Sequence, residues 1–293
     1  MNNPKVTVVI PCYNYGRFLQ RAVDSVLKQT YQDFEIIIVD DYSTDNTQEI
    51  STSFTDARIK YIRQSQNVGQ SANRNTAFKL AKGEIVALLD ADDWLNNQYL
   101  ENVVPAFNDP SVGFVYVFIQ GWDNGKTPVL ANKFQSENGK ITEKLFINNF
   151  IGTSFSFRRS LGKQGYKTDL SPKFNNLGCD WWFALEMSTK CNVVAIERPL
   201  YNYNFHSHQM SNDPQRRIIA DRIVQEKFLH QYPGQISKKT QKQAKYWSLI
   251  REGYYQRSAN YKWQACFSYL KACVVNPLSS LPYKGLVFTL IKG

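Results

Sequence analysis

The sequence lacks the features that mark disulfide-linked, zinc-binding and membrane-spanning proteins. Its five cysteines include no CxxC pair and lie far apart, which argues against a disulfide framework and a cysteine-based zinc site. No apolar run reaches the roughly 20 residues that a bilayer-spanning helix needs. The N-terminus enters a strand-like run at once, without the basic and apolar regions of a signal peptide, so we expect a cytoplasmic protein.

The first strand-to-helix turn is poor in glycine. The stretch PCYNYG (11–16) holds one glycine, so it matches neither the G-x-G-x-x-G fingerprint nor the Walker P-loop. This weighs against a nicotinamide or flavin oxidoreductase and against a P-loop nucleotidase. A nucleotide bound at this turn would need its phosphates neutralised in another way.

Acidic residues are scarce only towards the C-terminus. Residues 214–293 contain 14 Lys or Arg and 3 Asp or Glu, whereas residues 1–213 contain 21 and 22. A basic helical tail can contact an anionic membrane surface, nucleic acid or an acidic partner, or can be an ordinary solvated surface. Its final apolar segment, 278–293, either lies in a membrane interface or packs against the rest of the protein.

The first hundred residues alternate between strand-like and helix-like patterns. Short apolar runs rich in β-branched residues predict strands that are buried on both faces, at 6–10, 35–40, 59–62 and 84–90. Segments with helical spacing or helix caps lie between them, at 16–30, 43–54 and 67–83. Strands that alternate with helices predict a parallel, three-layer α/β sheet.

Three carboxylates, Asp90, Asp92 and Asp93, follow the fourth predicted strand. Ligands of open parallel sheets bind beyond the carboxyl ends of the strands. Two aspartates there can hold Mg²⁺ or Mn²⁺, and the metal can bridge the phosphates of a nucleoside diphosphate. Alternatively, Asp92 and Asp93 cap a helix that begins at Trp94. Three carboxylates within four residues repel one another unless a cation lies among them, which favours the metal.

Two long segments carry a resemblance to a known family. The stretch that runs from IPCYNYG to VDDYSTDNT (10–47), followed by NVGQSANRNTAFKLAKGEIVALLDADDW (67–94), resembles the N-terminal half of the family 2 inverting glycosyltransferases. A weaker resemblance continues to about residue 212. It implies transfer of a sugar from a nucleotide sugar, most often a UDP-sugar, to a hydroxyl group with inversion at the anomeric carbon. Cell-surface polysaccharide synthesis is the pathway that the commoner members imply.

The resemblance also implies the GT-A fold, a Rossmann-like, mostly parallel α/β sheet with helices on both faces. We expect a glycosyltransferase domain at 1–213, with a nucleotide-binding half at 1–100 and an acceptor half at 101–213. A basic helical extension at 214–293 follows. The implied partners are a nucleotide-sugar donor and a glycan or lipid-linked acceptor. The extension adds a peripheral membrane contact as an alternative, and no nucleic acid is expected.

Residues that match the family's nucleotide-binding positions lie in the first strand-end loops and in the third helical segment. Pro11 and Tyr13 match positions that line the base, and the Tyr13 ring is available for stacking. Asp40 matches the carboxylate that accepts the N3 hydrogen of uracil. Arg74 matches an arginine near the nucleotide; alternatively, it is an ordinary surface arginine. Tyr42 stands where relatives usually carry glycine, so either the turn differs or the tyrosine is strained.

The resemblance assigns a Mn²⁺ or Mg²⁺ site to the carboxylate cluster. Asp93 matches the principal metal ligand, Asp92 the residue near the ribose and the metal, and Asp90 has a supporting role. His206 matches a histidine that reaches the metal or diphosphate; alternatively, it is an exposed loop residue. Asn204 replaces an arginine of the family, whose diphosphate contact would then need another residue.

The reaction needs a base to take the proton of the acceptor hydroxyl. The resemblance makes Asp180 that base, within NNLGCDWWFALEM (175–187), although Cys179 takes the place of the usual glutamate. Asp180 could also act as the N-cap of the following helix. Aromatic rings that could pack on an acceptor sugar are Trp122, Trp181 and Trp182, with core packing as the expected role of at least one of the last two.

Two functions of other classes remain open from the sequence. The first is a protein that binds nucleotide sugars without turnover, for which loss of Asp93 or Asp180 would have been the sign, and both are present. The second is a basic adaptor for membranes or nucleic acid that uses residues 214–293.

Overall fold

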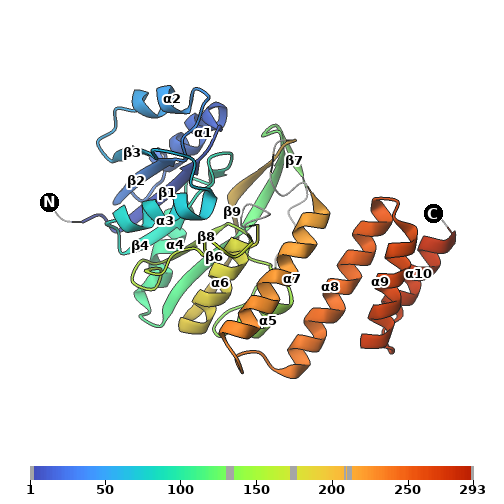
Figure 1. Cartoon of the computed structure of the whole chain (residues 1–293). Helices are drawn as coiled ribbons and strands as arrows, with labels where there is room; N and C mark the ends of the chain where they lie inside the picture. The colour runs from blue at the N-terminus through green and yellow to red at the C-terminus, as the bar shows by residue number, and fades with distance from the viewer. Residues whose placement is uncertain (1–2, 130–134, 172–176, 208, 210–212, 292–293) are drawn as a thin grey trace. The chain divides into compact units, whose positions relative to one another are not determined.

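The computed structural model describes residues 3–129, 135–171, 177–207, 209 and 213–291. The chain divides into two compact units, one formed by 1–141 with 150–209 and the other by 142–149 with 210–293. The second unit therefore contains a short segment of the predicted acceptor half in addition to the predicted extension. In Figure 1 its long helices run from orange to red.

The first unit is built on one mixed sheet with the strand order β3-β2-β1-β4-β8-β6-β9-β5, and β7 pairs with β6. Strands β1 to β4 are parallel, β8 is antiparallel to β4 and β6, and β5 is antiparallel to β9. The predicted α/β sheet is confirmed, and its first half, β1 to β4, is parallel. The strands are β1 Val6–Cys12, β2 Phe34–Asp40, β3 Ile59–Arg63, β4 Ile85–Leu88, β5 Trp94–Leu95, β6 Val112–Asp123, β7 Thr127–Val129, β8 Phe155–Arg158 and β9 Asn192–Phe205.

Helices cover both faces of this sheet because alternate residues of a strand point to opposite sides. Val6 and Val8 of β1 share one core cluster with Leu19 of α1. Val9 is buried outside that cluster, and α3 contacts β1 and β2. The helices of the unit are α1 Gly16–Leu27, α2 Thr47–Ser53, α3 Gln70–Leu80, α4 Tyr99–Val103, the 3₁₀ helix η1 Val104–Asn108 and α6 Cys179–Lys190.

Two local predictions were wrong. Strand β3 is only partly buried, because it lies at the edge of the sheet and pairs with β2 alone. No helix begins at Trp94: Trp94 and Leu95 form β5 and pair with β9, and α4 begins at Tyr99. Asp92 and Asp93 therefore do not cap a helix.

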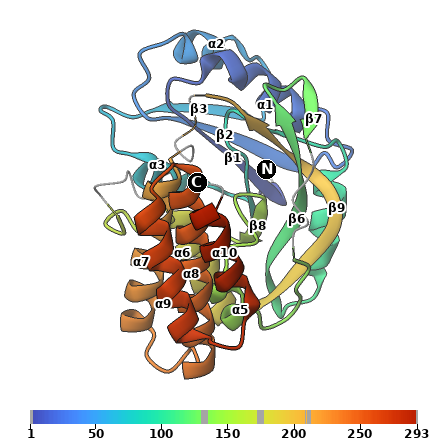
Figure 2. The same ribbon diagram turned by 90° about the vertical axis from the view of Figure 1, so that its right-hand side faces the viewer.

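The second unit consists of helices, as its sequence predicted. Two of their N-termini are capped by side chains, since Asp213 accepts from Gln215 N and Arg216 N, and Ser237 accepts from Thr240 N. Figure 2 shows α8, α9 and α10 side by side. No helix in the described part of the chain is long and apolar enough to span a bilayer. The helices are α5 Thr142–Ile147, α7 Pro214–Gln231, α8 Lys238–Ser258, α9 Lys262–Val275 and α10 Ser280–Ile291.

Candidate functional site

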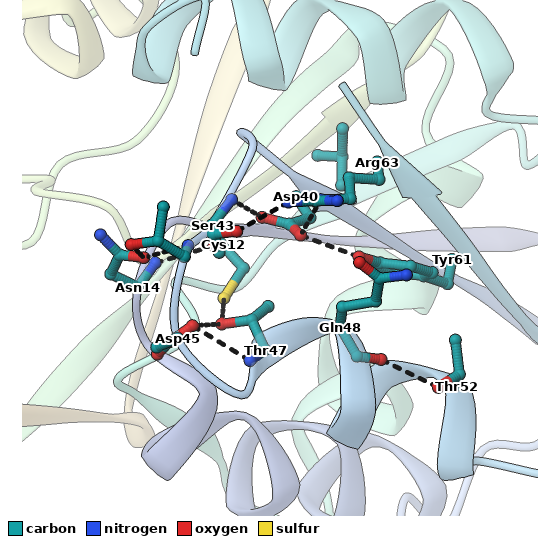
Figure 3. Close-up of polar contacts among 12 residues, drawn as sticks. Cys12, Asn14, Asp40, Ser43, Asp45, Thr47, Gln48, Thr52, Tyr61 and Arg63 are labelled. Carbon is teal, nitrogen blue, oxygen red and sulfur yellow. Dashed lines mark hydrogen bonds and ion pairs between the residues drawn. The ribbon is translucent and has the colours of Figure 1, made fainter. Parts of the chain in front are cut away.

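The loops after β1 and β2 are held together at the carboxyl edge of the sheet. Asn14 N donates to Ser43 Oγ at 2.8 Å, and Thr44 N donates to Asn14 Oδ1 at 2.8 Å. Gly16 N, at the start of α1, donates to Asp45 Oδ2 at 3.0 Å. Figure 3 shows the contacts that Asn14, Ser43 and Asp45 make in these loops. The two loops therefore form one fixed rim rather than two independent turns.

Two tyrosine rings are exposed on this rim. Tyr13 and Tyr42 are large aromatic residues that remain largely accessible to solvent. Tyr42 has a φ of 65°, and the Arg63 guanidinium lies 4.7 Å from the centre of its ring. A positive φ is costly for a bulky residue. Of the two possibilities that the sequence left for Tyr42, the structure shows the strained one.

Asp40 is fully buried below the rim. Its Oδ1 accepts a hydrogen bond from Ser43 N at 2.9 Å, and its Oδ2 accepts one from Tyr61 OH at 2.8 Å, with Arg63 Nε 3.6 Å away. Both oxygens thus hold the rim in place (Figure 3). In this structure a bound base cannot touch the carboxylate. Pro11 is likewise buried within β1.

A buried arginine joins two segments that are distant in the sequence. Arg74 Nη2 donates to Asp90 Oδ1 at 2.7 Å, and Arg74 Nη1 donates to Asp180 Oδ1 at 2.8 Å. The Arg74 side chain has no exposed surface. The alternative of an ordinary surface arginine was therefore wrong. Tyr166 OH donates to the same Asp180 oxygen at 2.8 Å, so Arg74 and Tyr166 together fix the position of Asp180.

Charge in this cluster is unbalanced. Burial raises the pKa of Asp90 to about 6, although Arg74 opposes the shift. Burial alone would lower the pKa of Arg74, but Asp180 and Asp90 raise it above its ordinary value. Two arginines thus lie among four carboxylates: Arg74 contacts Asp90 and Asp180, and Arg21 interacts with Asp92 and Asp93. Such an excess of negative charge favours a further cation.

Asp92 and Asp93 have different surroundings. Asp93 is buried: its Oδ2 accepts from Tyr201 OH at 2.8 Å and its Oδ1 accepts from Asn204 N at 2.8 Å. Burial raises the pKa of Asp93, and Asp92 and Asp90 raise it further. Asp92 Oδ2 instead lies 3.0 Å from His206 Nε2. A carboxylate oxygen of Asp92 and an imidazole nitrogen of His206 thus lie together, whereas both oxygens of Asp93 already accept hydrogen bonds from β9.

His206 is buried rather than exposed. Its ring lies 5.0 Å from the centre of the Phe18 ring and 5.6 Å from that of Tyr15. The alternative of an exposed loop histidine was therefore wrong.

The donor set is consistent with a divalent cation that is held jointly with a ligand. Within the described residues, no group of three or more His, Cys, Asp and Glu is arranged to hold a metal ion. Magnesium commonly uses only one or two carboxylates together with substrate phosphates. The side-chain amide of Asn204 is also buried, and neither of its polar atoms has a partner in the described part of the chain. A buried amide without partners is consistent with a polar ligand that completes the site.

The start of α6 rules out the N-cap alternative for Asp180 and confirms core packing for at least one of Trp181 and Trp182. Gly178, with a φ of 91°, is the N-cap, so Asp180 lies in the first turn and is not the cap. Burial raises the pKa of Cys179 to about 12, which leaves a neutral thiol where relatives carry glutamate. Trp181 and Trp182 are both fully buried and cannot pack on an acceptor sugar. Trp122 remains partly exposed, and its Nε1 donates to Asn202 Oδ1 at 2.8 Å.

Sequence reasoning missed Tyr166 and Tyr201. Tyr201 OH donates to Asp93 and accepts from the Asp90 backbone N–H at 3.2 Å. Tyr166 lies 14 residues before Asp180, and Tyr201 lies 108 residues after Asp93. Tyr166 stands in no motif, and Tyr201 lies in the segment of Asn204 and His206, in which the resemblance assigns it no role.

Comparison with known proteins identifies a family. The model of the family described as glycosyl transferase family 2 matches residues 7–165. "Glycosyltransferase GlyA" of Streptococcus pneumoniae is 31% identical over 242 residues, which cover 77% of this chain and 33% of GlyA. The Escherichia coli "UDP-Glc:alpha-D-GlcNAc-diphosphoundecaprenol beta-1,3-glucosyltransferase WfgD" is 37% identical over 153 residues, which cover 52% of this chain and 59% of WfgD.

A solved structure shares the fold. S. aureus TarS 1–349 in complex with UDP-GlcNAc has a TM-score of 0.69 and 20% sequence identity, covering 98% of this chain and 88% of that one. At this identity the likeness supports the fold alone. The matched region spans 33% of GlyA and 59% of WfgD, so both relatives extend well beyond it.

Proposed function

Because the chain belongs to glycosyl transferase family 2, we propose that it moves a sugar from a UDP-sugar to a hydroxyl group of a glycan or lipid-linked acceptor, with inversion. The observation that carries the proposal is the contact of Arg74 with two carboxylates. It joins Asp90, just after β4, to the predicted base Asp180. WfgD, whose name includes a UDP-sugar donor and a diphosphoundecaprenol acceptor, supports the choice of donor and acceptor. Synthesis of a cell-surface polysaccharide is the corresponding role.

In this proposal, residues 1–100 bind the donor and residues 101–213 bind the acceptor. The rim of Tyr13 and Tyr42 packs on the base, since both rings are accessible and lie on loops that are tied together. Asp40 acts as a positioning residue, because its oxygens are used by Ser43 and Tyr61. Selection of uracil by Asp40 would require the residues that enclose it to move, because it has no exposed surface.

Replacing an exposed rim tyrosine should weaken nucleotide binding without unfolding the protein. Stacking of a base on an aromatic ring is worth about 1–3 kcal/mol, so Tyr13→Ala and Tyr42→Gly should each weaken UDP binding by about tenfold. Glycine is chosen at position 42 because it tolerates the positive φ. Tyr13→Phe and Tyr42→Phe are the matched controls, which keep the ring and should bind UDP as the parent does. Calorimetric titration measures the affinity. If both truncated variants bind UDP with unchanged affinity, the two tyrosines do not contact the base.

The proposed metal ligands are Asp92 and His206, with Asp93 in support. Carboxylate oxygen is an ordinary ligand of Mg²⁺ and Mn²⁺, and imidazole nitrogen is a ligand of divalent first-row metals. When bound, the cation would supply positive charge that stabilises the departing diphosphate. Asp93 positions the segment through Tyr201 and the Asn204 backbone. The buried Asn204 amide is the candidate that takes over from the arginine of relatives.

The roles of Asp92 and Asp93 can be distinguished by measuring how much Mn²⁺ binds together with UDP in each variant. Asp92→Asn should weaken Mn²⁺ binding at least tenfold, because it removes a charged ligand. Asp93→Asn should weaken it less, since Asn can still accept the hydrogen bond from Asn204 N. The electron paramagnetic resonance signal of free Mn²⁺ in a UDP-saturated sample reports the bound fraction. If Asp93→Asn weakened Mn²⁺ binding more than Asp92→Asn, Asp93 would be the principal metal ligand.

Asp180 is the proposed base. Arg74 and Tyr166 hold its Oδ1, and no described residue hydrogen-bonds its Oδ2. That oxygen is available to take the proton of the acceptor hydroxyl as the hydroxyl oxygen attacks the anomeric carbon. One displacement from the face opposite the diphosphate gives inversion.

A further inference from the structure

The helical unit has an apolar face that the proposed reaction does not use. Trp263, Phe267, Leu270 and Val274 of α9 recur at helical spacing and are all exposed, Trp263 by 81% and Val274 by 83%. The opposite side of α9 is buried within the unit, at Ala265, Tyr269 and Ala272. Leu278, in the turn to α10, is 96% exposed. Exposed apolar residues on one side of a helix indicate a binding surface.

Helix α10 adds further exposed apolar residues to the unit. It packs on α9, and the two helices lie side by side in Figure 2. Val287, Leu290 and Ile291 of α10 are exposed as well. We call the following eight exposed apolar residues of the two helices and their connecting turn the α9–α10 face: Trp263, Phe267, Leu270, Val274, Leu278, Val287, Leu290 and Ile291.

The charge around this face has one sign. Residues 253–293 contain five Lys or Arg and no Asp or Glu. Lys262 begins α9, and Lys271 Nζ lies 4.1 Å from the centre of the Phe267 ring. In the rest of the unit, Arg222 forms an ion pair with Glu252, and Asp221 interacts with Arg217 and Arg251. Arginines therefore already offset acidic groups of the unit. Among the described residues, no ion pair involves Lys262 or Lys271 of α9.

A cavity lies beside the same turn. It has a volume of about 380 Å³ and is lined by Lys239, Lys242 and Trp247 of α8, and by Asn276 and Ser279 of the turn that carries Leu278. Two ammonium groups and neighbouring polar side chains can accommodate an anionic phosphate head group. The adjacent exposed leucine would then meet the acyl region.

We propose that the α9–α10 face docks on a membrane that contains anionic lipid. Apolar and aromatic residues flanked by lysines are typical of helices that lie in a membrane interface. Each Lys or Arg near an anionic surface contributes about 1 kcal/mol of attraction. A second copy would present the same positive charges and be repelled. Nucleic acid would leave the apolar residues exposed. The inference rests on the helical unit alone and does not depend on the proposed reaction.

The test is co-sedimentation of the full chain with two kinds of vesicle, one of phosphatidylcholine alone and one with added phosphatidylglycerol. The chain should bind the anionic vesicles at least tenfold more strongly than the neutral ones. The double variant Phe267→Ser/Val274→Ser should lose at least tenfold in binding to anionic vesicles. The matched control is Ile219→Ser, which removes an exposed apolar residue of α7. It should bind as the parent does.

Two outcomes would overturn the proposal. Equal binding to both kinds of vesicle, or none to either, would exclude an anionic lipid surface. If the double variant binds anionic vesicles as the parent does, the membrane contact lies elsewhere in the chain. If light scattering instead showed a dimer that the double variant loses, the face would be an interface between copies.

Discussion

Replacing Asp180 by Asn should lower the rate of sugar transfer by about 10²–10⁴-fold, because positioned general bases contribute that much. UDP binding should stay within about twofold of the parent, because Asp180 acts on the acceptor and not on the donor. The side-chain oxygen of Asn can still accept the hydrogen bonds of Arg74 and Tyr166, which keeps the loss specific to proton transfer. Transfer is measured as UDP release in the presence of acceptor, and binding by calorimetry.

Tyr166→Phe is the matched control for this experiment. It removes one hydrogen bond to the same carboxylate oxygen and leaves the Arg74 contact in place. We expect a rate loss below tenfold, since the change affects orientation and not the proton acceptor itself. Full transfer by Asp180→Asn would show that another group is the base. Equal loss of transfer and UDP binding would instead make Asp180 a donor-site residue.

Replacing Arg74 by Met should have the largest effect on stability. It leaves Asp90 and Asp180 without their counter-charge inside the protein. Breaking a buried ion pair typically costs about 3–5 kcal/mol. Because the two carboxylate side chains are still 19% and 21% exposed, we expect the lower end of that range. Urea unfolding measures the change, and transfer activity should be lost with it.

A second replacement separates charge from packing in this variant. Arg74→Met/Asp90→Asn removes one of the two stranded carboxylates, so it should recover part of the lost stability without recovering activity. The free energy of unfolding of the single variant could instead lie within about 1 kcal/mol of the parent's, below the usual cost of an unpaired buried charge. Arg74 would then not join the two halves of the site. If the double variant recovers nothing, the loss comes from the missing side-chain volume.

The sequence predicted the parallel half of the sheet because its signals are local. The apolar runs before Pro11, Asp40 and Asp90 are short, rich in β-branched residues and separated by helical spacing, and each forms a strand. The helix expected at Trp94 failed for the opposite reason. Trp94 and Leu95 pair with Tyr201 and Asn202 of β9, and pairing between such distant segments leaves no local pattern.

The candidate site could be predicted as a set of residue types, but not as a network. Strand ends placed Asp40, Asp90 and Asp92 at one edge of the sheet. The structure alone shows that Asp40 is enclosed and that Arg74 pairs with Asp180, which lies 106 residues later. Which oxygen of a carboxylate remains available depends on partners such as Tyr61 and Tyr166, and spacing cannot reveal them.

The most direct test of a UDP-sugar site at this edge of the sheet is calorimetric titration with UDP, GDP, CDP and ADP. Each nucleotide is titrated first with Mn²⁺ present and then after EDTA. UDP should bind most tightly, and EDTA should remove its binding. Tighter binding of GDP, CDP or ADP would contradict the proposed UDP donor. Undiminished UDP binding in EDTA would contradict the metal site of Asp92 and His206. No binding of any nucleotide would contradict the donor site as a whole.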